Sequence, residues 1–329
     1  MKSIIEKRYE LITRNLIEII EPNELINLLE KNKRPVVYHG YEPSSKAIHI
    51  GYLIGLQKHL DFIDAGLKLI ILLADLHAWL NEKGSWEEIR EMAEAYKNNF
   101  IAFGLPKNKV KFVLGSSFQL KKNYWIDVMK LALRIRLQRA KRSMTIIGRS
   151  EADPHVAQFI YPLMQVTDIK HLKVDIAFGD LAQRKVHMIA REELEAVGYK
   201  KPICLHHIDM QSLKANTKMS SSKPETTIFI TDTPEVIEKK IINAYCEPYK
   251  VENNPILQIV EFIIFGRIGV KEFKVEREAK FGGDIVYKNY HEIKKDYEKG
   301  LLHPLDLKKN VAREIIKIIT KIQKRLKKF

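Results

Sequence analysis

The sequence predicts an α/β protein in which a Rossmann-like parallel sheet with a helical insertion is followed by a mainly α-helical domain. Three observations predict this class. Short apolar runs alternate with helical patterns through the first part of the chain, as in a parallel sheet wound with helices. Long helical patterns interrupt the alternation at about 123–160, and helical periodicity dominates after Lys223. We therefore predict one domain over residues 1–225 and a second over residues 226–329.

Each element follows from its local pattern. Residues 1–32 are predicted as amphipathic helices, because apolar residues recur there at helical spacing. Strands are predicted where short apolar runs occur, at 36–38, 67–73, 111–114 and 203–207. Right-handed crossovers between them would place ligands beyond the carboxyl ends of the strands.

The insertion and the last hundred residues are predicted to be helical. A basic helix begins near Leu131 and continues through Arg142. Thr233 is the expected N-cap of a later helix, with Pro234 at its first position. A Gly-rich turn is expected at 281–284, and the final stretch combines an apolar stripe with a basic face.

Charge indicates a polyanionic partner. The 329 residues include 56 Lys and Arg against 41 Asp and Glu, a net charge of +15. With a phosphate site suspected, RNA is a natural candidate, and a generally lysine-rich proteome is the alternative explanation of the charge. The two cysteines, Cys204 and Cys246, are far apart, and His206 and His207 are adjacent rather than one helical turn apart. We therefore expect no disulfide framework and no protein-bound metal site.

Hydropathy indicates a cytoplasmic protein with no membrane association. No apolar run approaches the roughly 20 residues that a membrane-spanning helix needs. The N-terminal segment carries acidic residues such as Glu6 and Glu10 among its bases, unlike a signal or transit peptide.

The first motif that suggests chemistry is Pro43–Gly51. It follows the strand that contains Tyr38 and precedes a helical pattern that begins at Tyr52. A helix N-terminus has unpaired N–H groups and a positive dipole, so an anion binds there readily. Gly51 would allow a nucleotide to approach the backbone, and His49 can donate a hydrogen bond to a phosphate oxygen.

The second motif is Lys218–Ser222, one lysine and three serines around Met219. These groups can bind a pyrophosphate whose charge grows as it leaves. Alone, a His-x-Gly triplet or a serine run beside lysine is more often an ordinary loop. Together and in this order, the two motifs resemble the signature sequences of class I aminoacyl-tRNA synthetases.

Further segments resemble tyrosyl-tRNA synthetase in its archaeal and eukaryotic form. They are 72–80, 161–168, 183–188, 280–284 and 302–308, and the similarity spans nearly the whole chain. The resemblance implies a catalytic first domain and an anticodon-binding second domain. It implies ligation of L-tyrosine to tRNA(Tyr) with ATP, Mg²⁺ on the ATP phosphates, and a homodimer formed through the insertion.

The resemblance also implies a tyrosine pocket. In it, Tyr38 and Asp168 meet the substrate hydroxyl, while Tyr161, Gln165 and Gln183 hold the amino group and orient the substrate. A helix that carries Tyr161, Gln165 and Asp168 at i, i+4 and i+7 places all three on one face. Phenylalanine would leave the hydroxyl-binding groups unpaired, at roughly 1–3 kcal/mol each.

The remaining implied residues fall into three groups. The catalytic residues are His49, Lys218, Ser220 and Ser221. ATP would contact Pro43, Ser44, His49, Gly51, Tyr52, Lys218, Met219, Ser221 and Ser222. tRNA would contact Arg142 and Arg184 at the first acceptor-stem pair, and Phe281, His303 and Asp306 at the anticodon.

Three departures from the pattern leave alternatives open. Tyr52 replaces a histidine common in relatives, Ser221 replaces a second lysine, and the first motif is one residue longer than usual in this family. That longer spacing resembles tryptophanyl-tRNA synthetase, which is the nearest alternative, although Tyr38 and Gln183–Lys185 disfavour it. The other alternative is a non-catalytic RNA-binding relative.

Overall fold

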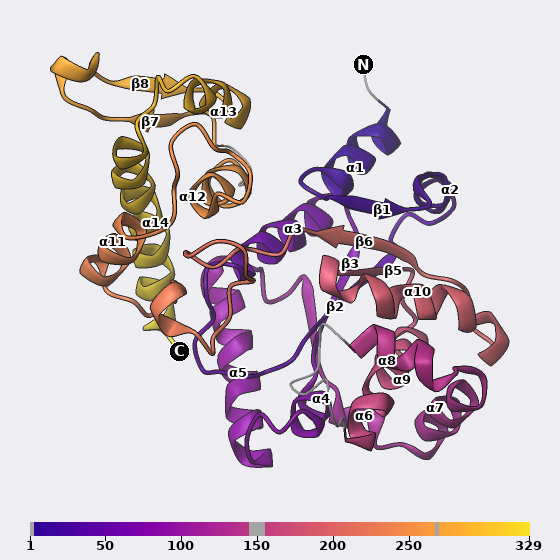
Figure 1. Ribbon diagram of the computed structural model, residues 1–329. Coiled ribbons are helices and arrows are strands. Elements are labelled where there is room, and N and C mark those ends of the chain that lie inside the picture. Colours follow the sequence, from indigo (N-terminus) through magenta and orange to yellow (C-terminus); the bar gives the residue numbers. More distant parts are fainter. Residues whose placement is uncertain (1–2, 145–154, 267–269) are drawn as a thin grey trace. The chain divides into compact units, whose positions relative to one another are not determined.

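The computed structural model describes residues 3–144, 155–266 and 270–329 (Figure 1). The chain forms two compact units. The first unit comprises residues 1–46, 58–97 and 105–208, and the second comprises residues 47–57, 98–104 and 209–329. Helices α3 (Tyr52–Asp64) and α5 (Trp86–Phe103) contribute residues to both units.

A six-stranded sheet organises the first unit, with the strand order β1-β6-β5-β2-β3-β4. All neighbouring strands run parallel except the pair β1 and β6. The strands are β1 (Glu18–Ile20), β2 (Val36–Tyr41), β3 (Lys68–Leu73), β4 (Val110–Leu114), β5 (Ile176–Asp180) and β6 (Ile203–His207). Continuous apolar runs such as Leu69–Leu73 suit strands that are buried on both faces. The predicted Rossmann-like fold is confirmed.

Two strands were missing from the sequence prediction. Residues 18–20 form β1 rather than part of a helix, because Glu18, Ile19 and Ile20 pair antiparallel with β6 across more than 180 residues of chain. The segment Ile176–Asp180 forms β5, in the middle of the sheet between β2 and β6. Its Gly179 and its short length weaken the strand signal in the sequence.

The other helices of the first unit lie between and beside the strands. They are α1 (Ile4–Thr13), α2 (Pro22–Lys31), α4 (Asp75–Leu80), α6 (Ser116–Gln119), α7 (Lys122–Arg134), α8 (Leu137–Met144), α9 (Val156–His171), α10 (Arg184–Glu193), and the 3₁₀ turns η1 (Leu181–Gln183) and η2 (Glu195–Val197). The helical insertion is therefore present as α7, α8 and the start of α9. The expected single basic helix is wrong: α7 ends at Arg134, where Ile135 is extended, and α8 begins at Leu137.

One core cluster of the first unit joins the sheet to helices that follow β2 and β3 in the chain. Buried side chains from β2 and β3, including Tyr38 and Leu72, belong to the same cluster as residues of α7, α9 and α10. Two of those partners, Tyr124 and Met164, are fully buried. This packing fixes α9 relative to β2, and both elements carry predicted site residues.

The second unit is mainly helical, as predicted. Its elements are η3 (Pro224–Thr226), α11 (Pro234–Ile242), α12 (Pro255–Gln258), the π-helix η4 (Ile259–Ile264), β7 (Phe273–Val275), η5 (Ala279–Phe281), β8 (Ile285–Tyr287), α13 (Tyr290–Glu298) and α14 (Pro304–Leu326). The Thr233 side chain accepts a hydrogen bond from the Val236 amide, so the predicted N-cap is confirmed. Helices α11 and α14 pack together.

The prediction missed the two-stranded hairpin of β7 and β8, which flanks the predicted Gly-rich turn. The turn itself contains Gly282 and Gly283, both with positive φ. Within the described part of the chain, no helix is both long and apolar enough to cross a membrane.

Candidate active site

Three predicted site residues lie on one helix. Tyr161, Gln165 and Asp168 are all carried by α9, and Tyr161 and Asp168 are buried. A buried helical face would ordinarily be apolar, so a glutamine and an aspartate there require polar partners or a ligand.

Asp168 has one satisfied oxygen and one free oxygen. Its Oδ1 accepts hydrogen bonds from Gln119 Nε2 and from the Tyr124 hydroxyl, each at 2.8 Å. Its Oδ2 has no hydrogen-bond partner among the described residues. His77 Nε2 lies 3.8 Å from Oδ2. Burial lowers the pKa of His77 to about 3, so this imidazole is neutral at pH 7. Oδ2 is therefore a buried hydrogen-bond acceptor to which a ligand hydroxyl can donate.

Tyr38 stands beside this carboxylate. It lies in β2, where it pairs with Ile70 of β3 and Ala177 of β5, and it is fully buried. Burial and the nearby Asp168 charge raise the pKa of Tyr38 well above its usual value, so it stays a neutral phenol. A Cβ at Gly40 would come within 3.3 Å of the Tyr38 hydroxyl. Tyr38 and Asp168 together offer a hydroxyl group and a carboxylate oxygen.

The other end of this α9 face carries amides and a second carboxylate. Gln165 Nε2 donates to Gln183 Oε1 at 2.9 Å, while the buried Oε1 of Gln165 has no partner among the described residues. The Tyr161 hydroxyl donates to Glu42 Oε2 at 3.0 Å. Asn81 also donates to Oε2, at 2.7 Å. This end provides acceptors for a positively charged ammonium group.

These side chains together suit a ligand with a hydroxyl at one end and an ammonium at the other. The free Asp168 Oδ2 would accept from the hydroxyl, and the free Gln165 Oε1 would accept from the ammonium. The structure thus brings together all five predicted tyrosine-binding residues in the first unit.

The titration of Asp168 gives a testable pH dependence. Burial raises its pKa from 3.8 to about 7, although the hydrogen bonds from Gln119 and Tyr124 act in the opposite direction and lower it. A raised folded-state pKa means that this group stabilises the fold at low pH and that the contribution is lost as pH rises toward 7. A hydroxyl donated to Oδ2 favours the ionised form, so binding of the L-tyrosine that the sequence resemblance implies should lower this pKa and release a proton.

We expect tyrosine binding to release about half a proton at pH 7 and almost none near pH 9. Calorimetric titration in two buffers with different ionisation enthalpies measures this number directly. The Asp168→Asn variant is the control and should show no such release. Equal proton release in the parent and the variant would contradict the assignment of the raised pKa to Asp168.

His49 and its neighbours form a second constellation, in the second unit. His49 forms an isolated antiparallel bridge with Phe229, and the Ile50 amide donates to the Ile228 carbonyl at 2.9 Å. His49 Nδ1 accepts a hydrogen bond from the Gly51 amide at 3.2 Å. Burial, together with the nearby Lys218 charge, lowers the pKa of His49 to about 3. The imidazole is therefore neutral, and with Nδ1 used as an acceptor its proton is on Nε2.

Gly51 is required by close packing. A Cβ at this position would lie 2.9 Å from the His49 ring and 3.1 Å from Met210 Cβ. Tyr52 begins α3, and its ring centroid lies 4.7 Å from that of His49. The α3 N-terminus and the His49 imidazole thus occur in one short segment, as the sequence predicted, and the Tyr52 and Leu53 amides there donate to the His49 and Ile50 carbonyls at 3.0 Å each.

The Lys218 loop is held by backbone bonds while its cation is accessible. Gln211 and Lys218 form an antiparallel bridge, and the Met219 amide donates to the Met210 carbonyl at 2.8 Å. Lys218 Nζ pairs with Asp209 Oδ1 at 2.5 Å, with about half of the lysine side chain exposed. Ala215 and Asn216 have positive φ values of 62° and 57°, which marks a tight turn before the lysine.

The serines that follow form a polar cluster. The hydroxyls of Ser220 and Ser222 lie 2.9 Å apart, and Ser221 is partly buried. The structure therefore brings His49, Gly51, Tyr52 and residues 218–222 together in the second unit. Pro43 and Ser44 belong to the first unit, where the Ser44 hydroxyl lies 3.4 Å from that of Tyr96.

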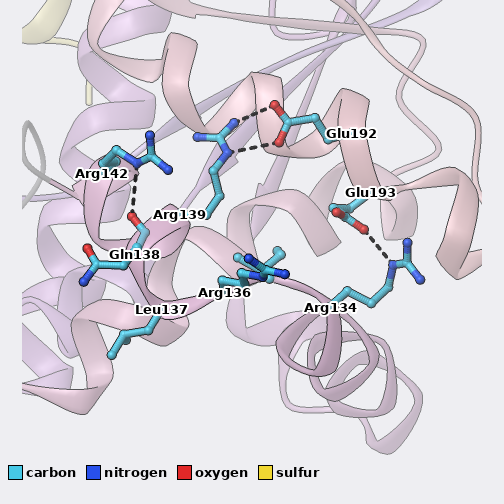
Figure 2. A pocket seen from close by; sticks show the side chains of 9 residues that line it. Arg134, Arg136, Leu137, Gln138, Arg139, Arg142, Glu192 and Glu193 are labelled. Carbon is cyan, nitrogen blue, oxygen red and sulfur yellow. Dashed lines mark hydrogen bonds and ion pairs between the residues drawn. The ribbon is translucent and has the colours of Figure 1, made fainter.

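The predicted tRNA contacts of the first unit lie on α8 and α10, which pack together. Arg142 is exposed and borders a pocket of about 450 Å³ (Figure 2). Three more arginines line this pocket, namely Arg134, Arg136 and Arg139. Two of these are neutralised, because Arg139 bonds Glu192 and Arg134 bonds Glu193. The pocket keeps a positive excess suited to phosphate.

The predicted anticodon contacts lie in the second unit. Phe281 is exposed, and Lys280 Nζ lies 4.9 Å from its ring centroid. His303 is the N-cap of α14, where its Nδ1 accepts from the Leu305 amide at 3.2 Å. Asp306 lies in the first turn of the same helix and is partly buried. An aromatic ring and a carboxylate are thus accessible for a nucleic acid base.

Three residues that hold the predicted tyrosine-binding side chains were not predicted from the sequence. Gln119 and Tyr124 hold Asp168, and Glu42 holds Tyr161. Glu42 directly follows β2, a position where ligand-binding residues are common, and could have been considered on that ground. Among the described residues, no group of three or more His, Cys, Asp or Glu side chains could hold a metal ion.

The fold and the two motif-bearing constellations define a class I aminoacyl-tRNA synthetase. A sequence profile described as "tRNA synthetases class I (W and Y)" matches residues 30–320. The tyrosine–tRNA ligase of Methanopyrus kandleri is 47% identical over 320 residues, which cover 97% of this chain and 98% of the relative. The tyrosine–tRNA ligase of Methanocaldococcus jannaschii is 45% identical over 318 residues, which cover 97% of this chain and 99% of that relative.

Solved structures agree with this assignment. A tyrosyl-tRNA synthetase from Archaeoglobus fulgidus, crystallised with L-tyrosine, is 48% identical and superposes with a TM-score of 0.93 over 98% of this chain and 99% of that chain. A tryptophanyl-tRNA synthetase from Plasmodium falciparum shares the fold at 19% identity and a TM-score of 0.72, covering all of this chain and 89% of that one. The chain belongs to the tyrosine–tRNA ligase family of class I synthetases.

Proposed function

We propose that this protein ligates L-tyrosine to tRNA(Tyr) in two steps. The tyrosine carboxylate attacks the α-phosphate of ATP, which gives tyrosyl-adenylate and pyrophosphate. The tyrosyl group then passes to the terminal adenosine of the tRNA. The observation that carries this proposal is the buried, unpartnered Oδ2 of Asp168 beside the Tyr38 phenol. Tyrosine-dependent exchange of pyrophosphate into ATP tests the first step.

The tyrosine pocket acts by positioning. Tyr38 and Asp168 bind the phenolic hydroxyl, and Tyr161, Gln165 and Gln183 bind the ammonium end. A fixed substrate needs little further ordering before attack, and this accounts for much of the rate gain in such reactions. A phenylalanine in the pocket would leave Asp168 Oδ2 without a donor, so the same contacts provide selectivity.

The ATP-binding residues act on phosphate charge. The neutral His49 donates from Nε2, and Lys218, Ser220 and Ser221 bind the pyrophosphate as its charge develops. Pro43, Ser44, Gly51, Tyr52, Met219 and Ser222 contact the nucleotide. Mg²⁺ enters with the ATP phosphates as part of the substrate and neutralises part of their charge. The half-exposed Lys218 has access to such a ligand.

tRNA recognition uses both units. Arg142 and Arg184 read the first acceptor-stem pair, which is C–G in this branch of the family. Phe281 stacks on an unstacked anticodon base, and His303 and Asp306 contact the anticodon. The high exposure of Phe281 supports a stacking role.

Replacing Asp306 by alanine should impair tRNA charging by about 5- to 100-fold, because a carboxylate contact to a base edge is lost. Pyrophosphate exchange should stay within about twofold of the parent, because activation requires no anticodon. A change of the first anticodon base of the tRNA should reduce the efficiency of charging less in the variant than in the parent. Glu314→Ala, on the same helix, is the control. Equal loss in variant and parent would contradict base reading by Asp306.

We further propose a cytoplasmic homodimer formed through the insertion, with the domain boundary near residue 225. Helix α7 supports the dimer, since Ile126, Met129 and Leu133 lie on one face at helical spacing. Leu133 is 89% exposed. Such a stripe is unusual on a free surface and suits a second copy of the same helix.

A further inference from the structure

Glu18 joins two side chains that come from different parts of the first unit. Its carboxylate accepts the single Arg184 Nε–H in a bifurcated hydrogen bond, at 2.7 Å to Oε1 and 2.9 Å to Oε2. His206 Nδ1 lies 2.8 Å from the same Oε2. Glu18 and His206 are also direct partners in the register of β1 and β6. The backbone pairing therefore determines where this carboxylate lies.

A buried histidine pair fixes the base of this arrangement. His206 Nε2 lies 2.9 Å from His187 Nδ1, and the two rings stack at an interplanar angle of 25°. Burial lowers the pKa of both histidines, so both rings are neutral. A neutral His206 has one ring proton. The 2.9 Å contact with His187 uses His206 Nε2, and His206 Nδ1 lies close to the Glu18 carboxylate without a hydrogen bond to it.

The contact leaves the functional end of Arg184 open. Arg184 is the first residue of α10 and directly follows Gln183 of the tyrosine pocket. Glu18 bonds only its Nε, and the terminal Nη nitrogens have no partner among the described residues. The arginine side chain is 45% exposed. The guanidinium is thus held on one edge while its other edge faces outward.

An arginine held in this way suits base reading. A planar guanidinium can donate two parallel hydrogen bonds to guanine O6 and N7 only when its plane and direction are correct. A free arginine side chain loses considerable rotational freedom when it binds. A carboxylate that already fixes Nε reduces this loss before the tRNA arrives.

We propose that Glu18 is a positioning residue that orients Arg184 for reading the guanine of the first acceptor-stem pair. The proposal rests on the tRNA role of Arg184 given above. Glu18 touches neither tyrosine nor ATP in this account, and it acts through the arginine alone. Its removal should therefore affect base-pair preference and leave amino acid activation unchanged.

The test compares charging of two transcripts that differ only in the first pair, C–G or G–C. We expect Glu18→Gln to reduce the preference for C–G by about tenfold in kcat/KM. Tyrosine-dependent pyrophosphate exchange should stay within about twofold of the parent. Glu24→Gln is the matched control, because Glu24 forms a two-bond bridge to Arg191, also on α10, at 2.8 Å for each bond. This control should keep the full preference.

A double-variant cycle decides whether Glu18 acts through Arg184. Arg184→Ala should lose the preference, and adding Glu18→Gln should change it by less than about twofold. Independent, additive losses would overturn the proposal, as would an unchanged preference in Glu18→Gln. If Glu18→Gln does not fold, Glu18→Asp keeps Arg184 and the charge but withdraws the carboxylate from Nε, and it should reduce the preference as well.

Failure of the proposed function has a different signature. A parent protein that lacks tyrosine-dependent exchange and charging would refute the ligase itself. A parent that charges tRNA, combined with an Arg184→Ala variant that keeps its preference, would overturn the present inference and leave the ligase intact.

Discussion

Asp168→Ala should lower kcat/KM for tyrosine activation by about 10- to 150-fold, because a hydrogen bond to a charged group contributes about 1.5–3 kcal/mol. The value of kcat/KM should fall for activation of tyrosine and not for activation of phenylalanine, because phenylalanine has no hydroxyl that can donate to Oδ2. The variant's preference for tyrosine over phenylalanine should therefore narrow. Pyrophosphate exchange with each amino acid in turn measures both effects.

The fold should survive this substitution, although two buried groups lose an acceptor. Gln119 Nε2 and the Tyr124 hydroxyl both bond Asp168 Oδ1, and Tyr124 keeps a second acceptor in the Met164 carbonyl at 2.8 Å. Asp168→Asn retains the side-chain volume and separates loss of charge from loss of packing. A folded Asp168→Ala protein with near-normal tyrosine affinity and turnover would refute the assignment.

Lys218→Ala should slow adenylate formation by about 100- to 1,000-fold, while tyrosine affinity stays nearly unchanged. The lysine side chain is half-exposed and its ammonium pairs with Asp209, and ion pairs that exposed contribute little to stability. A cation that acts on developing pyrophosphate charge affects the transition state more than the ground state. Rapid-quench measurement of a single turnover gives the rate of adenylate formation, and a separate tyrosine titration gives the tyrosine affinity. Together they distinguish an effect on the transition state from an effect on ground-state binding.

Lys214→Ala provides the matched control, because Lys214 is an exposed lysine in the same loop. It should leave the activation rate within about twofold of the parent. Equal losses in the two variants would mean that the loop contributes only general positive charge. An unchanged rate in Lys218→Ala would remove the lysine from the mechanism.

The parts of the site that the sequence predicted are those set by local periodicity. Tyr161, Gln165 and Asp168 share a helix, so their spacing alone places them on one face. The His49–Tyr52 segment was predictable for a similar reason, since a strand, a short loop and a helix follow one another there.

The parts that the sequence did not predict depend on distant pairing. Strand β1 exists because Glu18–Ile20 pair with β6, and three residues have too little pattern of their own to indicate a strand. Gln119 and Tyr124 lie more than 40 positions before Asp168, and only the packing of α6 and α7 against α9 brings them to its carboxylate. No local signal in either segment identifies such a contact.

We propose that this protein activates tyrosine and selects it through Asp168 and Tyr38. Exchange of labelled pyrophosphate into ATP, run with tyrosine, phenylalanine and tryptophan in parallel, tests it most directly. We expect robust exchange with tyrosine and only background exchange with the other two amino acids. Exchange driven by tryptophan, or no exchange with any of the three, would contradict the claim.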